Sequence, residues 1–162
     1  MKKLLYKLLH FYDEKKKFLL SKLRICLLRS RGACIGKNVR ILGPIKTSGN
    51  LQNIYIEDNV TLNVGVFLGA RGKITIKENS TISGFTKIVT GKLTGISPKT
   101  HDQDDVIIGN NVWIAINCCI LAGSKIGSDS VISANTVISG EIDKNSFVKS
   151  NDNLQIYYNK LK

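Results

Sequence analysis

The chain has 162 residues and 43% hydrophobic content, which suits a single domain with a continuous core. Its formal net charge is +12, and no apolar run is long enough to cross a bilayer or act as a signal peptide. Its four cysteines, Cys26, Cys34, Cys118 and Cys119, follow no metal-binding or redox spacing. We therefore expect a cytoplasmic protein with reduced thiols, no bound metal and no nucleic-acid partner.

Residues 1–31 are expected to form a basic amphipathic helical arm. They contain ten Lys or Arg and two acidic residues, and so supply eight of the twelve net positive charges. Two apolar stripes recur at helical spacing, namely Leu4, Leu8 and Tyr12, then Leu19, Leu23 and Leu27. The charged run 13–17 bends the arm or separates two short helices, and Gly32 is a plausible stop.

Two roles fit this arm. It could cap the open end of a repeat structure, which needs its terminal repeat covered. It could also lie on an anionic membrane, gaining on the order of 1 kcal/mol per basic residue near the surface. Capping alone does not require so many cations, so we expect a mixed role, with leucines partly on the body and a cationic face toward lipid or a pyrophosphate-linked glycan.

The body of the chain carries a six-residue ladder. The period, which neither an α-helix nor a pleated strand has, is set by Ile108, Ile114, Ile120, Ile126, Ile132 and Ile138. A step of six places one inward side chain on each flat face of a three-sided coil. Two residues before each isoleucine stands a small or β-branched residue suited to a corner, namely Val106, Val112, Cys118, Ser124, Ser130 and Thr136. The pattern predicts an all-β solenoid.

The same ladder begins upstream at Ile35 and changes phase several times. Each phase change predicts a bulge of the coil or a released loop. The longest interruption, residues 91–105, is polar and rejoins the ladder at Val106. Because a rigid solenoid holds the ends of such a loop still, we expect this loop to carry chemistry.

The most selective stretch is VIIGNNVWIAINCCILAGSKIGSDSVISANTVI, residues 106–138. It resembles the hexapeptide-repeat acyltransferases, specifically the acetyltransferases of bacterial surface polysaccharides, galactosides and serine. The resemblance implies a left-handed parallel β-helix over residues 32–148, after the arm at 1–31 and before a C-terminal tail at 149–162. It also implies a homotrimer and acetyl-CoA as the co-substrate.

Transfer of an acetyl group from a thioester to a hydroxyl needs a base to take the hydroxyl proton. His101 is the candidate, because it lies in the expelled loop and the unperturbed pKa of histidine lies near neutrality. Either Asp102 or Asp104 could orient its imidazole. The chain's other histidine, His10, is expected to be an ordinary residue of the helix surface.

The sequence departs from the family at the position of the base. In galactoside-type relatives the catalytic histidine directly follows a V-T-G sequence, whereas Val89-Thr90-Gly91 is followed here by Lys92. Either the loop delivers His101 to the same place, or the base has been lost. The C-terminal turn that helps hold the CoA nucleotide in relatives is also altered, at residues 147–154.

Other site residues follow from the resemblance. Trp113, Asn111 and Lys92 are expected in the acceptor cleft between subunits, and the backbone amide of Ala115 is expected to serve the thioester. Small residues that would let the pantetheine arm lie close to the coil are Ala122, Gly123, Ser133, Ala134 and Asn135.

The function that we expect is acetyl-CoA-dependent O-acetylation of a sugar hydroxyl in bacterial surface-polysaccharide biosynthesis. The basic arm favours a lipid-linked glycan acceptor at the inner face of the cytoplasmic membrane. Two alternatives remain: a non-catalytic β-helix scaffold derived from an acyltransferase, and an N-acyltransferase acting on an amino sugar. The fold alone does not choose among them.

Overall fold

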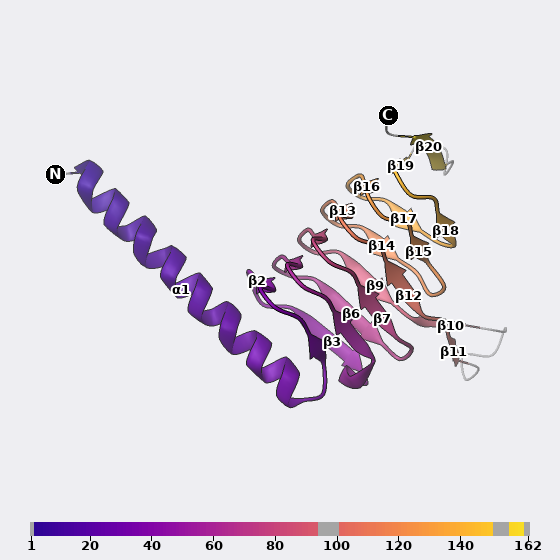
Figure 1. The fold of residues 1–162 in the computed structure, drawn as a ribbon, viewed down its shortest axis with the longest axis horizontal. Helices are drawn as coiled ribbons and strands as arrows, with labels where there is room; N and C mark the ends of the chain where they lie inside the picture. Colours follow the sequence, from indigo (N-terminus) through magenta and orange to yellow (C-terminus); the bar gives the residue numbers. More distant parts are fainter. Residues whose placement is uncertain (1, 94–100, 151–155, 161–162) are drawn as a thin grey trace.

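The structure is a computed structural model that describes residues 2–93, 101–150 and 156–160, with side chains described for 15–92 and 102–149. A long N-terminal helix, α1 (Lys2–Ser30), precedes a left-handed parallel β-helix. Figure 1 shows the coils stacked along one axis, with α1 leaving the first coil obliquely and the C-terminus at the far end. The predicted solenoid and its helical arm are confirmed.

Three sheets, parallel except for the last strand β20 (Ile156–Lys160), form the faces of the coil. Sheet A contains β1 (Cys34–Ile35), β4 (Ile54–Ile56), β7 (Ile74–Ile76), β12 (Val106–Ile108), β15 (Lys125–Ile126) and β18 (Glu141–Ile142). Sheet B contains β2 (Arg40–Ile41), β5 (Thr61–Leu62), β8 (Thr81–Ile82), β13 (Trp113–Ile114), β16 (Val131–Ile132), β19 (Ser146–Ser150) and β20 (Ile156–Lys160). Sheet C contains β3 (Lys46–Gly49), β6 (Phe67–Ala70), β9 (Lys87–Val89), β14 (Cys119–Ile120) and β17 (Val137–Ile138).

The ladder residues point into the coil and stack on one another. The downstream isoleucines are at most 2% exposed, and each pairs in register with the ladder residue one coil away, as Ile120 does with Ile138. The corner positions before them are also buried, and Ser124 and Ser130 hydrogen bond to backbone carbonyls. Side chains alternate between inside and outside along residues 118–120, so Cys118 at the corner is buried and Cys119 is only half-buried.

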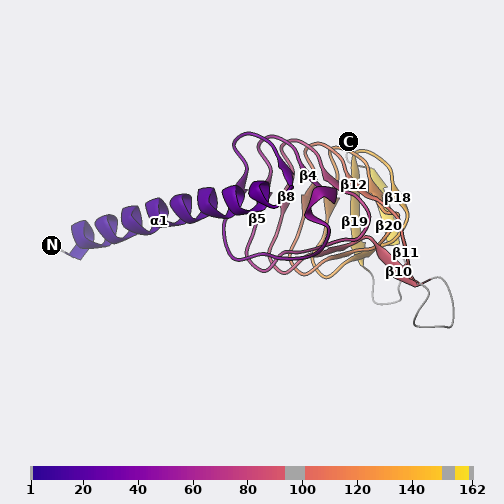
Figure 2. The same ribbon diagram turned by 90° about the horizontal axis from the view of Figure 1, so that it is seen from below.

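Every upstream phase change falls at the same corner of the coil, between sheet C and sheet A. The 3-10 helix η1 (Leu51–Asn53) lies there between β3 and β4, and residues 71–73 lie there between β6 and β7. The longest insertion forms an antiparallel hairpin, β10 (Gly91–Leu93) with β11 (His101–Gln103), which projects from the coil as Figure 2 shows. Its connecting residues, 94–100, lie outside the described part of the chain.

The arm is one continuous helix, so the expected separation into two short helices at residues 13–17 is wrong. Its last turns contact β1 and β2 at the open end of the coil. At the opposite end, β20 pairs antiparallel with β19, within the segment that the sequence suggested only as a tail. No helix in the described residues is long and apolar enough to cross a membrane.

Candidate active site

The β10–β11 hairpin is fixed at its root by hydrogen bonds between its two ends and to the preceding coil. The amide of Asp104 donates to the carbonyl of Thr90 at 2.9 Å, and the Thr90 hydroxyl binds the carbonyl of Gly69 and the amide of Gly72, both at 2.8 Å. On the preceding coil, the amide of Lys73 donates to Oδ1 of Asp105 at 2.8 Å. These bonds give the first residues of the hairpin a defined direction.

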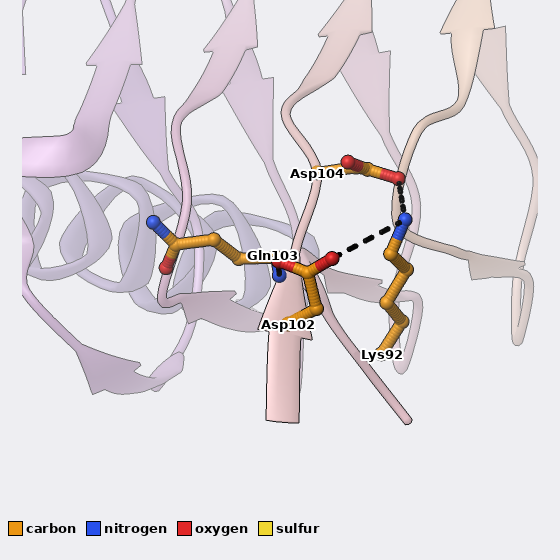
Figure 3. Close-up of polar contacts among 4 residues, drawn as sticks. All are labelled: Lys92, Asp102, Gln103 and Asp104. Carbon is orange, nitrogen blue, oxygen red and sulfur yellow. Dashed lines mark hydrogen bonds and ion pairs between the residues drawn. The ribbon is translucent and has the colours of Figure 1, made fainter. Parts of the chain in front are cut away.

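An ion cluster occupies one side of the hairpin, as Figure 3 shows. Nζ of Lys92 lies 2.5 Å from Oδ2 of Asp104 and 3.9 Å from Oδ2 of Asp102. All three side chains are partly exposed. The hydrogen bond that Lys92 donates to Asp104 raises the pKa of Lys92 above its ordinary value, so Lys92 carries a positive charge at neutral pH and cannot accept a proton there.

The ion cluster involves both carboxylates, Asp102 and Asp104, that were expected to orient His101. Both Asp102 and Asp104 engage Lys92, the residue at the position that follows Val89-Thr90-Gly91. The backbone of His101 pairs with Leu93, one register row beyond the pair of Lys92 and Asp102. The contacts of the His101 imidazole lie outside the described side chains, so its proposed orientation by a carboxylate stays a prediction.

The small residues expected along the cofactor separate into two groups. Ala122 and Gly123 lie at the corner between sheets C and A, beside the hairpin. A Cβ added to Gly123, whose φ is +81°, would lie 3.4 Å from Oδ2 of Asp104. Gly123, which we expect to lie along the cofactor, is therefore next to the ion cluster.

The second group lies at the other edge of sheet C, where sheet B ends. Residues 133–135 stack there on residues 115–117 of the preceding coil, with the amide of Asn135 bonded to the carbonyl of Ile116 at 3.0 Å. The amide of Ala115 donates to the carbonyl of Ile132 at 2.9 Å, and so is engaged within the coil. A donor for the thioester oxygen would therefore have to come from elsewhere in the site.

The remaining expected cleft residues lie near the corner between sheets A and B. Trp113 is 53% exposed on the outer face of sheet B, and its indole Nε1 donates to Oγ of Ser83 at 3.1 Å. Asn111 has a φ of +55°, and its carboxamide donates to Oδ1 of Asp129 at 2.9 Å. One chain thus spreads the expected site residues over three corners.

Sequence reasoning missed two features of this region. Ser83 orients the Trp113 indole, and Asp105 fixes the hairpin root to Lys73. The six-residue ladder could have indicated the contact with Ser83. Trp113 and Thr81 occupy equivalent positions on adjacent coils, and Ser83 follows Thr81 by two residues, so Ser83 lies near Trp113. The Asp105 bond spans 32 residues, and no local pattern indicates it.

Comparisons with known proteins agree with this architecture. A family model described as bacterial transferase hexapeptide (six repeats) matches residues 105–140. The putative colanic acid biosynthesis acetyltransferase WcaF of Escherichia coli K12 is 30% identical over 129 residues, which cover 79% of this chain and 70% of WcaF. The chain therefore belongs to the hexapeptide-repeat acetyltransferase family.

Other relatives are matched over smaller shares of their length. The chain spans 55% of the putative lipopolysaccharide biosynthesis O-acetyl transferase WbbJ of Escherichia coli K12, at 28% identity over 59% of this chain. It spans 16% of the bifunctional protein GlmU of Methanococcus vannielii, at 37% identity over 42% of this chain.

A solved structure shares the fold. The hexapeptide-repeat acetyltransferase VCA0836 of Vibrio cholerae, complexed with acetyl coenzyme A, superposes with a TM-score of 0.76 at 22% identity. The match covers 87% of this chain and 78% of that one.

Proposed function

We propose that this protein is an acetyl-CoA-dependent O-acetyltransferase that acts on a sugar hydroxyl during bacterial surface-polysaccharide biosynthesis. The observation that carries the proposal is the similarity to WcaF, which spans both the coil and the hairpin insertion rather than the repeats alone. The similarity to WbbJ supports the same class of acceptor.

The coil offers surfaces that suit acetyl-CoA, which supplies the acetyl group as an activated thioester. Ala134 is exposed at the second corner, and Gly123 leaves room beneath Asp104 that a side chain would fill. A pantetheine arm needs such a strip of small residues to lie close to the backbone. VCA0836, which has the same fold, was solved as a complex with acetyl coenzyme A, and this supports acetyl-CoA as the ligand proposed here.

In the proposed step, His101 accepts the proton of the sugar hydroxyl as its oxygen attacks the thioester carbonyl carbon. The new C–O bond forms, the C–S bond breaks, and the CoA thiolate leaves and is protonated. Lys92 stays positively charged throughout, so we assign it electrostatic stabilisation of the site rather than proton transfer. Asp102 and Asp104 hold the Lys92 ammonium in place.

We further propose that the working site lies between subunits of a homotrimer. The candidate residues lie at three different corners of one coil, so no single chain surrounds an acceptor with all of them. Side-by-side packing of coils would bring the hairpin corner of one subunit against a different corner of its neighbour. This arrangement explains why residues far apart on one chain could serve one reaction.

One observation favours a second candidate function, a non-catalytic scaffold. The position directly after Val89-Thr90-Gly91 is a lysine held in an ion pair, not a histidine. If His101 does not reach the acceptor, the hairpin has no histidine to serve as the base. Binding and transfer must therefore be measured separately.

The test compares the wild type with His101→Ala and His101→Gln, and with Lys37→Gln as a control on an exposed residue far from the hairpin. Binding is read as the thermal shift with acetyl-CoA, where a ligand at 100 times its Kd adds about 2.7 kcal/mol. Transfer is read as radiolabelled acetyl on a panel of nitrophenyl hexosides and hexosaminides. Hydroxylamine then separates a labile ester from a stable amide.

We expect a saturable shift in all four proteins, and labelled ester that falls by about 10²–10⁴-fold in both His101 variants only. Full transfer by His101→Ala would overturn the assignment of the base. A stable amide product would identify an N-acyltransferase. No shift at millimolar acetyl-CoA and no transfer would establish the scaffold.

A further inference from the structure

The outward face of α1 carries exposed apolar residues that the proposed acetyl transfer leaves unused. We call its three leucines, Leu19, Leu23 and Leu27, the leucine stripe. They recur every four residues and are 69%, 55% and 55% exposed. A stripe at this spacing lies on one side of a helix.

The leucine stripe does not serve to attach the helix to the coil. That contact uses other residues: Oγ of Ser21 accepts from the amide of Ile41 at 2.8 Å, and Nη1 of Arg24 donates to the Ile41 carbonyl at 3.0 Å. Leu28 is buried in the same contact. The expectation that the leucines pack partly on the coil is therefore wrong for this stripe, because capping is done by a different face.

The positive charge around the leucine stripe favours an anionic bilayer over a second copy of the chain as its partner. Residues 15–31 contain seven Lys or Arg and no acidic residue. Arg24 and Arg29 bond to backbone carbonyls, which leave their charge uncompensated. Two stripes meeting from two copies of the chain would bring fourteen basic residues together, with no acidic residue from either segment. An anionic bilayer would neutralise them while accepting the leucines.

The positive surface extends from the helix onto the coil. A groove of about 1510 Å³ separates α1 from the first coil, and cations line it from both sides, with Lys22 and Arg29 on the helix and Lys37 and Arg40 on the coil. Both ribbon views show α1 projecting away from the coils, so its outward face is open to a planar surface (Figure 1, Figure 2).

We propose that the leucine stripe and its flanking cations dock this protein onto an anionic phospholipid bilayer. The leucines insert at the level of the acyl chains, and the lysines and arginines that are not bonded to the coil contact the lipid phosphates. Docking is independent of the acetyl transfer proposed above, which is assayed on water-soluble acceptors. Failure of one measurement therefore does not imply failure of the other.

The experiment is co-sedimentation of the full chain with vesicles of phosphatidylcholine alone or mixed equally with phosphatidylglycerol. The test variant is Leu19→Gln/Leu23→Gln/Leu27→Gln. The matched control replaces three exposed apolar residues of the coil away from the groove, as Phe85→Gln/Ile116→Gln/Val137→Gln. Circular dichroism checks that each variant retains its helix and strands, and sedimentation velocity without lipid records the oligomeric state.

We expect wild type and control to bind the anionic vesicles, and this binding to weaken at high salt. Neither protein should bind vesicles of phosphatidylcholine alone. Binding by the leucine variant should fall by on the order of tenfold or more. Absence of binding by the wild type, or equal binding by the leucine variant, would overturn the proposal. So would a leucine variant that keeps its lipid binding but loses an oligomer formed by wild type and control.

Discussion

At the scale of single residues, the coil depends on left-handed backbone at one repeated position. Nine described non-glycine residues have positive φ, and each stands three residues before an inward ladder residue. Eight of them are Asn or Asp, namely Asn38, Asn59, Asn79, Asn111, Asn117, Asp129, Asn135 and Asn145. These side chains tolerate left-handed backbone best among non-glycine residues, and several of them hydrogen bond to the equivalent residue one coil away.

Phe85 is the exception among these nine, with a φ of 60° and a side chain that is 54% exposed. We expect Phe85→Asn to raise the free energy of unfolding by about 1 kcal/mol, because it relieves left-handed strain at little cost in burial. Urea unfolding measures the change, and Asn117→Phe should move stability in the opposite direction. A loss of stability in Phe85→Asn would mean that the ring's packing over Gly65 outweighs the strain.

Cys118 gives a prediction about reactivity and pH. Burial raises the pKa of its thiol above the ordinary value, whereas Cys26 and Cys34 are exposed. Iodoacetamide should label Cys26 and Cys34 in the native protein and reach Cys118 only after unfolding. Mass spectrometry of the labelled peptides checks this, and rapid native labelling of Cys118 would contradict it.

The raised pKa of Cys118 also determines how the stability of the protein changes with pH. Above the ordinary thiol pKa, the unfolded chain loses the Cys118 proton before the folded chain does, so stability falls as pH rises toward the raised pKa. Cys118→Val should remove the part of this loss of stability that comes from the thiol. Valine is the residue at the equivalent corner position of the preceding face, Val112. Stability below the ordinary thiol pKa should stay largely independent of pH at this site.

At the scale of elements, α1 takes the place of a preceding coil. The amides of Arg40 and Leu42 bond to the next coil, while the amide and carbonyl of Ile41 face the open end and meet Ser21 and Arg24 instead. A solenoid whose first strand left these groups buried and unpaired would lose the hydrogen bonds that every other coil makes. The helix therefore serves as the structural cap with one face, which leaves its other face for a partner.

Ser21→Ala tests this cap. We expect it to lower the free energy of unfolding by about 1–3 kcal/mol, because the buried amide of Ile41 loses its acceptor. Hydrogen exchange at Ile41 should accelerate in the same variant. Ser30→Ala, whose hydroxyl is exposed and bonds only within the helix, is the control and should change little. Unchanged exchange at Ile41 in Ser21→Ala would show that the cap does not depend on this bond.

At the scale of the whole molecule, stability is distributed along the stacked ladder. Each inward residue touches its equivalents on the adjacent coils, so the core is a continuous column rather than a central cluster. The insertions all leave at one corner, which keeps the register of the three sheets intact from the first coil to the last. The hairpin can thus differ in length and sequence without disturbing the column.

The stacked core predicts that truncation to alanine has very different effects on stability at two neighbouring positions of sheet C. Ile120→Ala should lower the free energy of unfolding by about 2–5 kcal/mol, because the cavity lies between two well-packed coils. Val137→Ala, on the adjacent coil but with a side chain that is 52% exposed, should change it by less than about 0.5 kcal/mol. Chemical denaturation measures both, and similar effects would contradict a core confined to the ladder.

The sequence alone determined which side chains enter the core, because a six-residue period admits one inward position per face and the downstream isoleucines mark it without interruption. It also indicated where the coil would release a loop. It did not reveal that Lys92 meets Asp104, since that contact depends on how the hairpin strands pair around residues 94–100.

Only the tertiary structure decided which face of α1 meets the coil. Helical spacing shows that the leucines share a face, but the rotation of the helix is set by the unpaired backbone groups of Ile41, which a serine and an arginine satisfy better than leucines can. The spread of candidate site residues over three corners is likewise a property of the closed coil. A linear pattern records which residues repeat, whereas their meeting in space depends on contacts between distant segments.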